Sequence, residues 1–169
     1  MENAHLERPE ALYVGNMLAG QLSHQENLGA LLADYAGLRG IEAVKVEASC
    51  ASGAAAFRMG YMAVAGGMQD LVVVCGVEKM TDTRGERTTS ALVAASDATY
   101  EGEQGVSFVA LNALLMQRYM YEFGYKREDF GGFAINAHKN AVHNPYAMFP
   151  KEISAKAFAR AKMIAEPVS

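Results

Sequence analysis

Short apolar runs alternate with helix-like periodicity over the first half of the chain. The apolar runs that favour strands are Ala11–Gly15, Ala43–Ala48 and Leu71–Cys75. Between them, Gln25–Leu38 carries large apolar side chains at three- and four-residue spacing, and Cys50–Val64 is rich in Ala and Met, so both stretches are predicted to be helices. This alternation predicts an α/β fold with a parallel sheet covered by helices on both faces and joined by right-handed crossovers.

The second half shows a different pattern. Glu78–Gln104 is polar and too long for an ordinary connection between two elements. We therefore interpret it as a long segment with a functional role. Helices are predicted near Val106–Phe123 and Arg127–Val142, followed by a loop at His143–Pro150 and a short helix near Ser154–Met163.

Composition narrows the class of protein. The chain has 169 residues, 51% hydrophobic and 20% charged, which is enough to bury one core. It has no apolar run long enough for a membrane span, and its polar start does not resemble a secretory signal. Two cysteines cannot form a disulfide framework, so we expect a cytoplasmic protein. A net charge of −4 argues against a nucleic-acid partner.

Charge is unevenly distributed along the chain. Residues 138–169 carry two acidic side chains and five basic ones, namely Lys139, Lys151, Lys156, Arg160 and Lys162. This basic end could attract an anionic ligand, but composition alone favours a solvated helical face with ordinary lysines.

Cys50 is the leading candidate for chemistry. It is predicted to lie at the turn where the strand Ala43–Ala48 leads into a helix, among small neighbours that permit a sharp turn. The start of a helix favours a thiolate, and its free N–H groups can stabilise an oxyanion. The alternative is a small cysteine packed between helix and sheet. Cys75, inside an apolar strand, fits that second interpretation.

Several motifs, in one register over almost the whole chain, resemble the thiolase family. They are YVGNM (13–17), SCASGAAAFRMG (49–60), GVEKMTD (76–82) and AHKNAVHNPYAMF (137–149). The branch they resemble comprises the archaeal acetyl-CoA acetyltransferases and their sterol-carrier-protein-type relatives.

The resemblance implies a thiolase-like layered fold (αβαβα), of which this chain covers the N-terminal half plus part of the loop domain. Residues 1–82 would form a partial βα core with the nucleophile, and residues 83–169 a partial loop domain, with no separate second domain. The chain is expected to be incomplete at both ends. In thiolases a central strand precedes the position of Met1, so the strands present here are expected to flank a gap.

The resemblance also assigns roles to residues. Cys50 corresponds to the nucleophile that takes the acyl group, and its backbone N–H to half of an oxyanion hole. Gln104 and Gly105 correspond to the part of the substrate tunnel nearest the acyl group. His138–Phe149 belongs to the loop domain over which coenzyme A lies, although no single lysine can be assigned to its phosphates.

Other catalytic motifs of the family are missing from the sequence. It contains no Gly-His-Pro motif and no Cys-x-Gly motif. We therefore expect no turnover from this chain alone, and a need for further thiolase segments or a partner chain. Coenzyme A would be substrate and product, so no cofactor is expected. No metal is expected either, because the four histidines and two cysteines lack ligand spacing.

Three functions remain open at this point. The first is an acetyl-CoA C-acetyltransferase that uses Cys50 for Claisen condensation or thiolysis, in lipid or isoprenoid metabolism. The second is a non-catalytic subunit that binds coenzyme A or acts as a scaffold. The third is a β-ketoacyl synthase-type condensing enzyme. An acyl-CoA is the expected substrate of the first of these. The family also implies a homo-oligomer formed through the strand Ala43–Ala48, once the missing segments are supplied.

Overall fold

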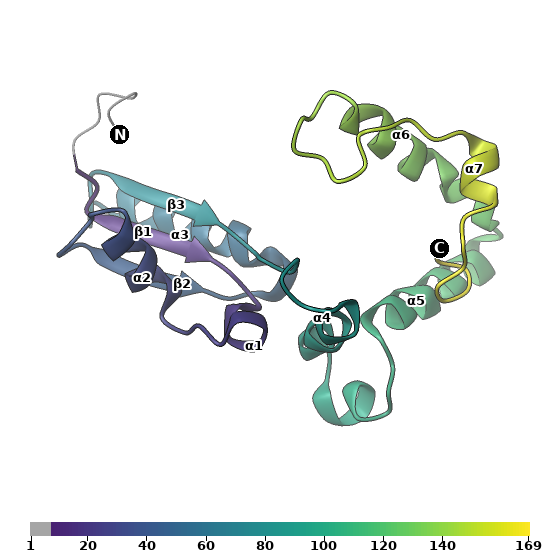
Figure 1. Cartoon of the computed structure of the whole chain (residues 1–169), viewed down its shortest axis with the longest axis horizontal. Coiled ribbons are helices and arrows are strands. Elements are labelled where there is room, and N and C mark those ends of the chain that lie inside the picture. Colours follow the sequence, from purple (N-terminus) through teal and green to yellow (C-terminus); the bar gives the residue numbers. More distant parts are fainter. Residues whose placement is uncertain (1–7) are drawn as a thin grey trace. The chain divides into compact units, whose positions relative to one another are not determined.

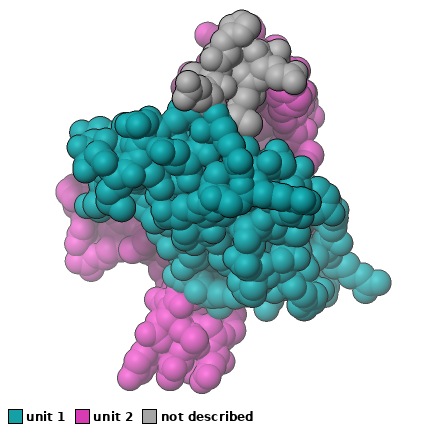
Figure 2. Space-filling view, turned by 90° about the vertical axis from the view of Figure 1, so that its left-hand side faces the viewer, with its two compact units in different colours: residues 1–95 teal, residues 96–169 magenta. Residues whose placement is uncertain are grey.

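The chain forms two compact units in a computed structural model that describes residues 8–169. The first unit ends at Ala95 and the second runs from Ser96 to Ser169; Figure 2 colours them separately. We describe each unit by itself. The expected division into residues 1–82 and 83–169 stays a prediction.

The first unit is built on a three-stranded parallel sheet (Figure 1). Its strands are β1 (Ala11–Gly15), β2 (Glu42–Val46) and β3 (Val72–Gly76), in the order β2-β1-β3. Gly15 lies opposite Val46 on one side and Gly76 on the other, so all three strands end at the same level. This arrangement confirms the predicted α/β fold.

Helices cover both faces of this sheet. They are α2 (Leu28–Tyr35), between β1 and β2, and α3 (Ser52–Ala65), between β2 and β3. The short helix α1 (Ala19–Ser23) lies between β1 and α2 in the chain. Every residue of β1 is buried, and its side chains alternate between the two layers: Ala11 and Tyr13 pack with residues of α3, whereas Leu12 and Val14 pack with those of α2. The continuous apolar run in β1 follows from this two-sided burial. Cys75 is half-buried on the α2 face.

The expectation of a gap in the sheet is wrong. β1 pairs directly with β3 along its whole length, from Ala11 opposite Val72 to Gly15 opposite Gly76. Direct pairing lets the N–H and C=O groups of the two strands satisfy one another, whereas a gap would leave them without partners in the middle of the sheet.

The helix before β2 is shorter than its periodicity predicts. It begins after Asn27 and ends before Ala36, although Gln25–Leu38 was expected to be helical. Asn27 has a positive φ of 51°, which interrupts the helical backbone, and Leu38 enters the core from the loop after α2. The five-residue helix α1 is too short to leave a periodic signal.

The rest of the first unit lies beside α1. The polar stretch after β3 contains the helix α4 (Gly85–Leu92), followed by a short turn η3 (Val93–Ala95). Leu18 and Leu22 form a small cluster with Ala91, which packs α4 against the α1 region.

The second unit contains the three predicted C-terminal helical regions and one short helix, η4, that was not predicted. They are η4 (Ala98–Gly102), α5 (Phe108–Phe123), η5 (Arg127–Phe130), α6 (Gly131–Ala141) and α7 (Ala155–Ala159). The Arg127 guanidinium donates to the carbonyls of Phe158 and Pro167 at 3.1 Å each, which ties the C-terminal segment to η5. Within residues 8–169, no helix has the length and apolar character that crossing a bilayer requires.

Candidate active site

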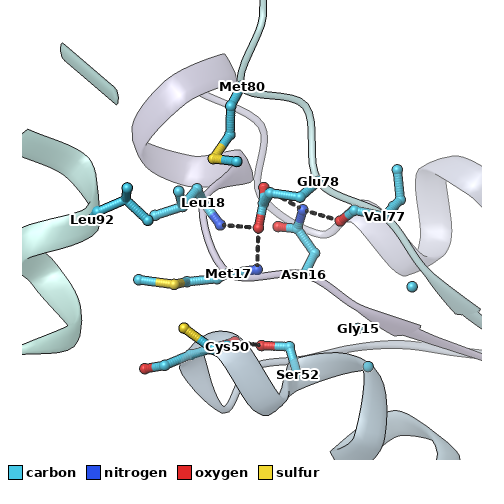
Figure 3. Close-up of a pocket in the computed structure, with 13 residues that line it drawn as sticks. Gly15, Asn16, Met17, Leu18, Cys50, Ser52, Val77, Glu78, Met80 and Leu92 are labelled. Carbon is cyan, nitrogen blue, oxygen red and sulfur yellow. Dashed lines mark hydrogen bonds between the residues drawn. The ribbon is translucent and has the colours of Figure 1, made fainter. Parts of the chain in front are cut away.

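Three loops meet where the parallel strands end, and they line an open cavity of about 350 Å³ (Figure 3). They follow β1, β2 and β3, and the loop after β2 contains the 3₁₀ turn η2 (Ser49–Ala51) with Cys50. Parallel α/β sheets bind ligands at this edge, because the loops there converge from neighbouring strands. The lining residues are Gly15, Asn16, Met17, Leu18, Ser49, Cys50, Ser52, Gly53, Gly76, Val77, Glu78, Met80 and Leu92.

The turn that carries Cys50 has an unusual backbone. Ser49 has a positive φ of 49°, a conformation that is rare for a residue with a side chain. Ser52 holds the turn: its buried hydroxyl accepts from the Ala48 N–H at 2.9 Å and donates to the Ser49 carbonyl at 2.7 Å. The strained residue therefore lies directly before Cys50, inside a loop fixed by a side chain.

Gly15 allows the start of α3 to approach the end of β1. A Cβ atom at this position would lie 2.6 Å from the Ser52 carbonyl oxygen and 2.7 Å from the Gly53 Cα. Both neighbours are backbone atoms, which cannot give way as the tip of a side chain could. Glycine at position 15 thus sets the distance between the sheet and the turn of Cys50.

Cys50 itself is available for chemistry. It is a free, exposed thiol, and Figure 3 shows its sulfur on the side of the turn that faces Met17. Its backbone N–H makes no hydrogen bond to the rest of the described chain. A nucleophilic sulfur and an unpartnered donor at the same residue can act together on a thioester: the thiolate attacks the carbonyl carbon, and the N–H receives the oxyanion.

The loops after β1 and β3 are joined by a carboxylate. Glu78 Oε2 accepts from the backbone N–H groups of Met17 at 2.9 Å and Leu18 at 3.1 Å, and its Oε1 accepts from Asn16 Nδ2 at 3.0 Å. Asn16, only 4% exposed, also donates to the Val77 carbonyl at 2.8 Å. These bonds fix the wall of the cavity that Met17 contributes (Figure 3).

The other residues assigned from the sequence lie in the second unit. Gln104 and Gly105 are exposed, in the turn between η4 and α5, where Gly105 has a φ of 76°. Their place beside the acyl group stays a prediction. The basic side chains of residues 138–169 are all exposed. Among the described residues, no group of three or more His, Cys, Asp or Glu side chains could hold a metal ion.

Asn16, Ser52 and Glu78 were not singled out from the sequence. Asn16 directly follows Gly15, and Glu78 comes two residues after β3. Polar residues at the carboxyl ends of two buried strands are a usable signal for a site, once the strands are known to be neighbours.

Comparisons with known proteins point to one family. The family described as "Thiolase, N-terminal domain" matches residues 3–165. Two relatives are named acetyl-CoA acetyltransferase: that of Methanothermobacter thermautotrophicus is 45% identical and that of Methanocaldococcus jannaschii 42%, each over 94% of this chain. The benzoylsuccinyl-CoA thiolase subunit BbsB of Thauera aromatica is 28% identical over the full chain.

The length of these relatives is also informative. The matched region covers 41%, 40% and 43% of the three proteins, so the chain spans less than half the length of each. The match to the family nevertheless extends from the first strand to the last helix. The turn at Cys50, the parallel sheet that presents it and this match together show that the chain belongs to the thiolase family.

Proposed function

We propose that this protein is a thiolase-type acyltransferase of the acetyl-CoA acetyltransferase kind, in which Cys50 takes an acyl group from acyl-CoA. The observation that carries the proposal is the exposed thiol of Cys50, on a strained turn at the cavity and next to its own unpartnered N–H. The names of the two archaeal relatives support the choice of substrate.

The first half of the reaction would use only groups at this turn. The Cys50 thiolate forms a bond to the thioester carbonyl carbon, and the carbonyl electrons move to oxygen, which the Cys50 N–H stabilises. The bond between that carbon and the coenzyme A sulfur then breaks. Coenzyme A leaves as a thiolate and takes a proton from solvent, and the acyl group stays on Cys50 as a thioester.

The second half needs a base beyond this turn. A second acetyl-CoA loses a proton from its methyl group, and the resulting carbanion attacks the acetyl group on Cys50. Acetoacetyl-CoA forms and the Cys50 thiolate is released; the reverse reaction is thiolysis. Because the sequence lacks the Gly-His-Pro and Cys-x-Gly motifs, we expect this chain to accept an acyl group but not to complete condensation.

Intact-mass measurement tests the first half-reaction. After incubation with acetyl-CoA, the wild-type chain should gain about 42 daltons, the mass of one acetyl group added as a thioester. Cys50→Ser should lose this adduct, and Cys75→Ser, the matched control, should keep it. An adduct that persists in Cys50→Ser contradicts the proposal. Coenzyme A binding without any adduct would favour the scaffold function instead.

The oligomeric state, the cellular compartment and the metabolic role are proposals as well. We propose a homo-oligomer that forms through β2, because this strand lies at an edge of the described sheet and leaves one side of its backbone without a strand partner. We also propose the cytoplasm as its compartment, since an exposed thiol stays reduced there, and a role in lipid or isoprenoid metabolism.

A further inference from the structure

We propose that Glu78 is a positioning residue for acyl transfer: it holds the loop after β1 so that Met17 faces Cys50 and limits the length of the acyl group. The proposal rests on the function proposed above and adds a determinant of substrate specificity to it. Its starting point is the set of three donors that converge on one carboxylate, from Asn16, Met17 and Leu18.

The chemistry of these donors requires a carboxylate. Two of them are backbone N–H groups on Oε2 and the third is a side-chain amide on Oε1, so both oxygens of Glu78 must accept. An ionised carboxylate offers only acceptors, whereas glutamine would turn an N–H₂ group toward one of these donors. Aspartate keeps both acceptors but is shorter by one methylene, so it cannot reach all three donors from the same backbone.

Asn16 connects the same loop to the sheet. Its Nδ2 donates to the Val77 carbonyl as well as to Glu78, and its Oδ1 accepts from the Ala19 N–H at 3.0 Å. The backbone around it continues the sheet, since the Val77 N–H donates to the Gly15 carbonyl at 3.1 Å. The loop after β1 is therefore anchored at Asn16, while Glu78 fixes the two residues that follow.

Those two residues form an apolar wall of the cavity. Met17 and Leu18 line it together with Met80 and Leu92, and Figure 3 shows the Met17 side chain across the cavity from Cys50. A methionine side chain adapts to its surroundings, so the backbone position must set how much room remains beside the sulfur of Cys50. Release of the Met17 and Leu18 N–H groups would let this wall move and admit a longer acyl chain.

Single-turnover acylation of the full chain tests this proposal. The rate at which Cys50 gains mass would be measured with acetyl-CoA and with hexanoyl-CoA, for wild type, Glu78→Gln and Met17→Ala. The matched control is Glu86→Gln, which removes the same charge from an exposed side chain outside the cavity that makes no hydrogen bond to another described residue. Alkylation by iodoacetamide reports the reactivity of the thiol without any acyl-CoA.

The expected result is a change in the ratio of the two rates. The hexanoyl-to-acetyl ratio should rise about tenfold in Glu78→Gln and in Met17→Ala, which is the lower end of the discrimination that one methylene produces in an apolar pocket. Glu78→Asp should fall between wild type and Glu78→Gln, and the control should match wild type. Alkylation should stay within about twofold, because the thiol remains accessible. An unchanged ratio in Glu78→Gln overturns the proposal, as does an equal fall in both rates.

Failure of the proposed function would give a different result. In that case iodoacetamide would alkylate wild-type Cys50, but neither acyl-CoA would acylate it. Without acylation of Cys50, the proposed role of Glu78 in limiting the acyl length would also be wrong. Amide hydrogen exchange at Met17 and Leu18 shows separately whether Glu78 holds the loop: faster exchange in Glu78→Gln supports this part, and unchanged exchange overturns it.

Discussion

Ser52 provides a sharp test of how the turn at Cys50 is held. Its hydroxyl makes two hydrogen bonds, one to the N–H of Ala48 and one to the carbonyl of Ser49, and the residue is only 5% exposed. Substitution by alanine removes both bonds and changes the side-chain volume very little. Any effect therefore reports on the loss of this clamp.

The expected cost follows from these two bonds. A hydrogen bond within a protein contributes about 1 kcal/mol to stability, so Ser52→Ala should lower the free energy of unfolding by about 2 kcal/mol. With a typical slope for urea, this corresponds to a midpoint about 1 M lower. The strained φ of Ser49 costs about 1–2 kcal/mol more than an ordinary conformation, so the turn should also relax once it is released.

Urea unfolding measures the effect on stability, and the rate of Cys50 acylation measures the effect on the turn. The midpoint of unfolding should fall in Ser52→Ala, and acylation of Cys50 by acetyl-CoA should slow because the turn no longer holds one conformation. Ser49→Gly is the matched variant: glycine adopts the positive φ without strain and keeps both bonds to Ser52, so its midpoint should equal or exceed that of wild type. If Ser52→Ala leaves both the midpoint and the acylation rate unchanged, the clamp is refuted.

Two further predictions concern the sheet. Burial, followed by the negative charge of Glu42, raises the pKa of Tyr13 above its ordinary value of 10.0. The folded state thus holds the proton of Tyr13 more tightly than the unfolded state does. The stability that this proton contributes is therefore complete below about pH 10 and is lost as the pH rises further. Since Tyr13→Phe has no such proton, its urea midpoint should depend less on alkaline pH than that of wild type. The proposed assembly through β2 predicts a molar mass in light scattering that is a multiple of 18.2 kDa, and a strictly monomeric mass would contradict it.

The parts of the fold that the sequence predicts best are those buried on both sides. β1 covers the predicted residues Ala11–Gly15, because an apolar run bounded by polar residues leaves little choice of position. β3 is shifted by one residue from the prediction, and β2 ends two residues earlier than expected. The helices are harder to place, because a single residue such as Asn27, with its positive φ, decides where a helix begins.

The candidate site was predictable only in part. Cys50 could be found because a strand, small residues and a helix follow one another along the sequence. The contacts of Glu78 with Met17 and Leu18 join residues about sixty positions apart, so they depend on which strands are neighbours. The sequence interpretation expected the strands to flank a gap, whereas β1 and β3 pair directly and so bring these two loops together.

Because the three strands end at the same level, the loops that follow them can vary in sequence and length in a particular way. Since Gly15, Val46 and Gly76 are paired in one row, each loop starts from the same rigid edge, and the backbone pairing below does not depend on what the loops contain. A loop can then be exchanged or lengthened without a shift in strand register, in the way that rigid scaffolds carry variable loops in other folds. The loop after β1 and the loop after β3 must change together, however, because the carboxylate of Glu78 joins them. Libraries that diversify these two loops should therefore retain more folded variants when Asn16 and Glu78 are kept than when these two residues are varied as well.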